Sequence, residues 1–363
     1  NTTGASNVAV GANALDANTT ADNNTAIGLG ALGSNTTGEN NSALGYGTLG
    51  SNTDGSHNTS VGYLALNANT TGAENTAVGG LALDANTTGI YHVAIGHLAL
   101  SGNTTADRNT AVGHAALRFN STGAENVAVG TNALSANTTA SNNTAIGHAS
   151  LNGVTTGGSN TAIGGGGPLS ACTTGSNNTV IGKDAGTAIT TGTKNTALGS
   201  LALDANTTGA ENTAVGQQSL TANTTASNNT AIGYYSLASN TTGTHNTAVG
   251  HSALDACSTG NRNTAVGYEA ATAVTTAADV DAFGAYALNS NTTGTRNVAL
   301  GRSALQSNTT TSDHTAVGHE ALKLNSTGQN NTAVGSYALD ANTDGDNLTA
   351  VGQSALTGNT TGG

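Results

Sequence analysis

The sequence lacks most of the residues from which globular cores are built. Met and Trp are absent, there are only two Phe, and aromatic residues make up 3% of the 363 residues. Large apolar side chains supply most of the burial free energy of an ordinary core. This composition argues against a conventional globular domain. It leaves a low-complexity disordered chain, or a repeat protein built around small side chains.

Charge and long apolar runs are also scarce. Charged residues make up 8% of the chain, the formal net charge is −12, and there is no basic run, so nucleic acid is not an expected partner. No apolar stretch approaches the ~20 residues that a membrane helix needs, so we expect no membrane insertion. No signal peptide is recognisable and the chain begins inside its repeat. We therefore interpret it as a mature chain or a fragment.

A strict repeat replaces the missing residue types. The Gly that closes words such as "TAVG" recurs every 17 residues from Gly11 to Gly164 and, after one step of 18, from Gly182 to Gly352. We call this Gly column 0 and number the following residues columns 1 to 16. The 21 repeats predict a single continuous solenoid domain over residues 1–363, with a one-residue insertion near 164–168.

The repeat favours strands over helices. Gly at column 0, Gly at column 10 and the "NTT" between them would interrupt a helix every few residues. They leave room for strands of about five residues. We therefore predict an all-β fold, a parallel β-solenoid or β-roll with 17 residues per coil and about 21 coils.

Three columns indicate which side chains form the core. Column 16 is apolar in all 21 repeats and column 4 is Leu in 19, so both are expected to point inward, with column 14 facing the same way as column 16. Column 15, between them, should point outward, yet it is Ala in 19 repeats. Together with the small residues of columns 3 and 6, it predicts a face packed against another chain. The alternative is that the solenoid's own turn geometry requires Ala.

The Asn of "NTT", in column 7, has the substitution pattern of a buried residue. Where it changes, it becomes Val154, Cys172, Ile189, Cys257 or Val274. We expect these Asn side chains to point inward and to form a hydrogen-bonded ladder between coils. The Asn of column 13 follows the same logic, since its substitutes include Val280, Leu348, His92 and His314.

An inward column 7 has two consequences. The sequons at Asn18, Asn35 and Asn86 would be poor glycan acceptors. Cys172 and Cys257 would be buried thiols five coils apart, too far for a disulfide bond.

Columns 1, 2, 5, 11 and 12 vary most and predict the solvated edge, with the Tyr, His, Lys and Arg residues. One coil separates Tyr46 from Tyr63, and His97 from His114. These four residues are a possible surface ligand strip for sugar or metal. The alternative is ordinary surface variation, with rings that stack on one another.

Catalytic motifs are not recognisable. There is no Ser/His/acid triad spacing, zinc cluster or phosphate loop, and "GGGGP" at 164–168 lacks the Lys-Ser/Thr of such a loop. Asp279 and Asp281 in "ADVDAFG" are the only acidic interruption of the repeat. We expect a non-enzymatic protein with no cofactor and no metal site.

The words "NTAVG", "NVAVG" and "NTAIG" resemble the head repeats of trimeric autotransporter adhesins and the similar NTAVG/NTTG arrays of phage tail fibres and surface fibres. The resemblance implies a left-handed roll and three chains packed side by side. It also implies adhesion, for example to host-surface glycans, and a location outside the cell, on its surface or in a virion tail fibre.

These observations predict a structural or adhesive extracellular fibre that forms a homo-oligomer, such as a trimer or an end-to-end filament. The alternative is a ligand- or ice-binding solenoid that presents a Thr or Tyr/His ladder. An ice-binding face needs outward Thr on a flat sheet, whereas column 14 is expected to face inward, so the fibre ranks first.

Overall fold

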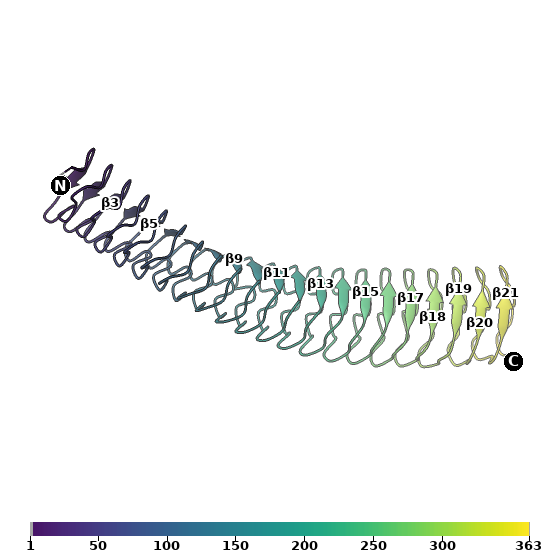
Figure 1. The fold of residues 1–363 in the computed structure, drawn as a ribbon. Coiled ribbons are helices and arrows are strands. Elements are labelled where there is room, and N and C mark those ends of the chain that lie inside the picture. Colours follow the sequence, from purple (N-terminus) through teal and green to yellow (C-terminus); the bar gives the residue numbers. More distant parts are fainter. Residues whose placement is uncertain (1–2, 363) are drawn as a thin grey trace. The chain divides into compact units, whose positions relative to one another are not determined.

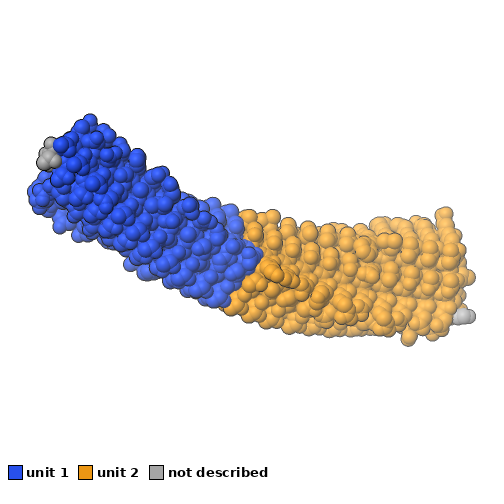
Figure 2. All heavy atoms as spheres, viewed as in Figure 1, with its two compact units in different colours: residues 1–178 blue, residues 179–363 orange. Residues whose placement is uncertain are grey.

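The computed structural model describes residues 3–362 and divides the chain into two compact units, residues 1–178 and 179–363 (Figure 2). Each unit is a parallel β-solenoid in which one turn takes about 17 residues and contributes one strand (Figure 1). The predicted fold class is therefore confirmed. Nothing in the described part of the chain forms a helix that is long and apolar enough to cross a membrane.

Each strand has three residues, in columns 14 to 16, and is shorter than the five residues expected. The strands of the first unit are β1 Val8–Val10, β2 Thr25–Ile27, β3 Ser42–Leu44, β4 Thr59–Val61, β5 Thr76–Val78, β6 Val93–Ile95, β7 Thr110–Val112, β8 Val127–Val129, β9 Thr144–Ile146 and β10 Thr161–Ile163.

The second unit continues the same pattern. Its strands are β11 Thr179–Ile181, β12 Thr196–Leu198, β13 Thr213–Val215, β14 Thr230–Ile232, β15 Thr247–Val249, β16 Thr264–Val266, β17 Asp281–Phe283, β18 Val298–Leu300, β19 Thr315–Val317, β20 Thr332–Val334 and β21 Thr349–Val351.

Within each unit every strand pairs in parallel with the next, and each residue lies opposite its own column in the following coil. Thr110, Ala111 and Val112 of β7 thus pair with Val127, Ala128 and Val129 of β8. Column 0 ends every strand, because its Gly adopts a φ between +125° and +146° that is closed to other residues. This geometry keeps the strands short and fixes their register.

The direction of the strand side chains is the reverse of the one expected. The column 15 alanines are buried, for example Ala145 at 0% exposure, whereas column 16 points outward, with Ile146 38% exposed. Column 14 is also part-exposed or exposed throughout the described strands. The predictions of an inward column 16, an inward column 14 and an outward column 15 were therefore wrong.

The narrow interior explains this reversal. The column 4 leucines are fully buried opposite the strand, as predicted, and leave room for little more than a methyl group. The coil with Val180 in column 15 shows the limit, because its column 4 residue is Gly186. A Cβ on Gly186 would lie 3.4 Å from the Val180 methyl groups and 3.0 Å from Ile189 Cδ1. The inferred exchange of volume between columns 4 and 7 is thus confirmed.

Columns 3 and 15 face each other inside the solenoid, which explains why both are small. Where column 15 carries Ser60, column 3 of the preceding coil carries Thr48, and their hydroxyl groups are hydrogen-bonded at 2.5 Å. Column 6 lies at the surface, with Phe119 55% exposed. Columns 3 and 15 therefore pack inside their own chain, and the prediction that they form an outer contact face was wrong.

Two Asn columns line the rest of the interior, as predicted. In column 7, the Asn52 amide donates to Asn35 Oδ1 and to the Gly55 carbonyl, both at 2.8 Å. In column 13, Asn41 Oδ1 accepts the backbone N–H of Asn58 at 2.9 Å. The sequon residues Asn18, Asn35 and Asn86 are buried in these ladders. The buried amides therefore join each coil to the next within a unit.

The leucines of column 4 adopt an unusual backbone conformation. Leu134, for example, has a φ of +52° and is completely buried. The left-handed region costs a residue with a Cβ roughly 1–2 kcal/mol, which burial of a Leu side chain offsets. The sequence did not signal this turn, because Leu is not a residue that marks positive φ.

Candidate functional site

The largest regular surface feature is the outer side of the strands, which we call the strand face and define as columns 14 and 16. Ile95, Ile146 and Ile232 on it are 38% to 40% exposed, and Leu44 is 49% exposed. Each column repeats once per coil along a unit, so the face consists of parallel rows of Thr and of aliphatic side chains, ~4.8 Å apart.

The strand face is nearly free of charge. Among the described strands, columns 14 and 16 hold Thr, Ser, Val, Ile, Leu and Phe283, and a single ionisable residue, Asp281. Asp281 was expected in an inward column and instead lies part-exposed on this face. A flat surface of methyl groups and hydroxyls has no nucleophile or general base, so its chemistry is that of contact and not of reaction.

The proposed ligand strip of columns 1 and 2 separates into two ring pairs. Tyr46 and Tyr63 stack at 5.4 Å between ring centroids, and His97 and His114 at 5.6 Å. Gly80 occupies column 1 in the coil between the pairs, so the four rings do not form one surface. Within each pair the facing rings contact each other, which leaves those faces closed to a sugar.

A larger aromatic cluster lies in the second unit. His251 stands between Tyr234, at 5.3 Å, and Tyr268, at 5.1 Å. Tyr235 and Tyr286 pack edge-on against the two ends of this column. The 17-residue spacing of the three column 1 rings could have indicated the cluster from the sequence. Because both ends are covered, it resembles a clasp between coils more than a binding platform.

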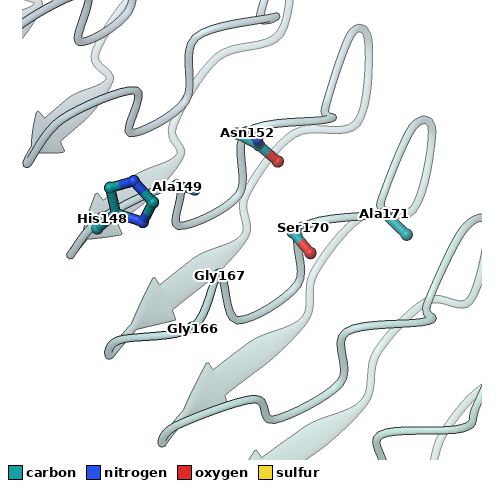
Figure 3. Close-up of a pocket in the computed structure, with 7 residues that line it drawn as sticks. All are labelled: His148, Ala149, Asn152, Gly166, Gly167, Ser170 and Ala171. Carbon is teal, nitrogen blue, oxygen red and sulfur yellow. The ribbon is translucent and has the colours of Figure 1, made fainter.

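The inserted residue is absorbed beside a surface hollow of about 400 Å³ (Figure 3). Its lining comes from two consecutive coils, with His148, Ala149 and Asn152 on one, and Gly166, Gly167, Ser170 and Ala171 on the next. The hollow exists because glycines replace side chains there, as a Cβ on Gly165 would meet no atom within 4 Å. Apart from His148 it presents only neutral groups, so it does not resemble a catalytic pocket.

The acidic interruption of the repeat does not form a site. Asp279 receives two hydrogen bonds from the Arg262 guanidinium, at 2.7 and 3.0 Å, and this partner lowers the pKa of its carboxyl group. Asp281 belongs to the strand face. Within residues 3–362 no three His, Cys, Asp or Glu side chains lie close enough together to hold a metal ion.

Both cysteines are buried free thiols, as the column 7 substitutions predict. Cys172 donates to the Gly175 carbonyl and Cys257 to that of Gly260, the bond that an Asn amide makes elsewhere in this column. The amide acceptor of the preceding coil then loses its donor. Asn137 Oδ1, before Val154, and Asn240 Oδ1, before Cys257, have no hydrogen-bond partner.

We expect the thiols to be inert in the folded protein. Burial raises the pKa of both Cys172 and Cys257 to about 11, so at about pH 8 almost no thiolate is present. A thiol reagent should modify neither residue within hours, and both within minutes after unfolding in guanidinium. Rapid modification of native protein, measured by mass spectrometry, would contradict the buried position of column 7.

No protein-family model matches this chain, and no curated protein matches its sequence.

Proposed function

We propose that this chain is a structural, non-enzymatic fibre protein of the extracellular space or a virion, and that its strand face packs against further copies of the same chain. The observation that carries the proposal is the uncharged, regular strand face with its outward aliphatic rows. The location outside the cell and the adhesive role are supported by the resemblance of the repeat words alone.

The size of the strand face supports a protein contact. Ten strands of three residues in the first unit cover roughly 450 Å², and the second unit offers a similar area. Soluble monomers rarely expose apolar patches above a few hundred Å². The two areas together approach the ~800 Å² that a stable interface covers on each partner.

The regularity of the face favours a second copy over any other partner. Another copy has the same coil spacing, so two strand faces can match row by row along a whole unit. A globular partner has no such period. The lack of charge also removes the electrostatic attraction on which polyanions depend. Methyl rows such as those of Ile95, Ile146 and Ile232 are suited to dry packing between chains.

The test is the oligomeric state of the full chain, measured by light scattering and sedimentation at micromolar concentration. The native chain should be an oligomer. A triple variant with Ile95→Lys, Ile146→Lys and Ile232→Lys should be a monomer, with association weakened at least ~100-fold, because the lysines remove apolar contact and repel one another across the interface.

The matched control carries three lysines on the exposed column 9, through Thr88→Lys, Thr139→Lys and Thr225→Lys. It has the same net charge and should assemble like the native chain. A native chain that is monomeric under these conditions, or a control that dissociates as fully as the strand-face variant, would refute the proposed interface.

A second candidate function, ice binding, is favoured by one observation. The argument against it was an inward column 14, whereas the Thr side chains of this column lie on the outer side of the sheet, next to Val and Ile. Regular rows of hydroxyl and methyl groups can order water in a lattice.

Thermal hysteresis separates the two functions. Ice binding predicts that a monomeric native chain depresses the freezing point below the melting point. It further predicts that the strand-face lysines abolish this effect and that the column 9 lysines leave it intact. An assembled chain without thermal hysteresis supports the fibre instead.

A further inference from the structure

Two histidines replace Asn inside the column 13 ladder, one in each unit. His92 and His314 are both 1% exposed. His92 Nε2 lies 2.6 Å from the Ala106 carbonyl, and His92 Nδ1 lies 3.1 Å from the backbone N of Asn109. Each ring thus occupies the place of an Asn side chain that spans two neighbouring coils.

This geometry allows one protonation state. The backbone N–H of Asn109 needs an acceptor, so His92 Nδ1 must carry no proton, and Nε2–H then donates to the Ala106 carbonyl. His314 is held in the same way, because its Nδ1 accepts the N–H of Asn331 and its Nε2 lies 2.9 Å from Thr311 Oγ1. A proton on Nδ1 would place two donors face to face.

We propose that His92 and His314 are proton-sensitive joints, at which neighbouring coils separate in mild acid while the other coils of each unit stay folded. Protonation converts a ladder acceptor into a donor and places a charge in an interior otherwise lined by amides and alanines. Because a solenoid coil contacts only its neighbours, the disruption stays local.

The carboxylates near the two rings oppose this effect only in part. Asp107 acts on His92, and Asp313 and Asp346 act on His314, each favouring the charged ring. Burial is the larger influence. It lowers the pKa of His92, and it lowers the pKa of His314 to about 4. An opened coil has an ordinary His pKa near 6.5, so stability is complete above about pH 6.5 and falls as the pH drops toward 4.

The experiment is hydrogen exchange on the full chain at about pH 7 and pH 4.5, with native protein and the variant His92→Asn plus His314→Asn. Asn is the usual residue of this column, so the variant keeps the ladder. At pH 4.5 the native coils around residues 92–109 and 314–331 should exchange roughly 10- to 100-fold faster than those of the variant. At pH 7 the two proteins should agree.

The control variant, His57→Asn plus His245→Asn, changes two exposed histidines of column 12 and should behave like the native chain. A further variant with His314→Val follows the natural Val280 of column 13 and should also resist acid. Equal exchange in native and His92/His314 variant proteins at pH 4.5, or acid loss of protection spread over all coils, would overturn the proposal.

Discussion

Lysine at position 145 should unfold its coil, whereas lysine at position 146 should be tolerated. Ala145 is 0% exposed and its methyl group faces the column 4 leucines, so Ala145→Lys forces a long chain and a charge into a filled interior. We expect a loss of more than about 4 kcal/mol. Ile146 is 38% exposed, and Ile146→Lys should change the free energy of unfolding by about 1 kcal/mol or less.

Urea unfolding of dilute, monomeric protein and hydrogen exchange of β9 (Thr144–Ile146) measure this pair of effects. Neighbouring residues of one strand serve as each other's control, since the introduced side chain is the same. The reverse result, with Ile146→Lys unfolding the coil, would restore the inward column 16 that the sequence had suggested.

The second large effect is expected at column 0, from Gly130→Ala. Gly130 has a φ of +131°, and a Cβ there would lie 2.6 Å from the Gly147 carbonyl oxygen. Backbone strain and the displacement of the next coil should together cost about 3–5 kcal/mol. Thermal unfolding followed by circular dichroism, with exchange of the neighbouring coils, tests this expectation.

Gly165→Ala is the matched control for this substitution. A Cβ on Gly165 meets no atom within 4 Å, and its φ is not positive. The change should leave stability within about 0.5 kcal/mol of the native chain. Similar losses for both variants would mean that column 0 is not the tight contact between coils described above.

Much of the candidate site could not be predicted because its residues break a common rule. Large aliphatic side chains are usually buried and Ala carries little preference, so Ile146 was assigned to the core and Ala145 to the surface. The ring pairs Tyr46–Tyr63 and His97–His114 were found correctly from their spacing. Their contact with each other, which closes the facing rings, became visible only with the side chains in place.

The sequence by itself determined the coil. The period gave the number of turns, Gly placed the ends of the strands, and the substitutes of Asn, such as Val154 and Cys172, identified columns that point inward. Only the tertiary structure decided which side of each strand is the inner one. Alternation along a strand has a period of two and is satisfied by either choice. The choice was made by volume, since the Leu and Asn columns fill the interior and leave space for a methyl group alone.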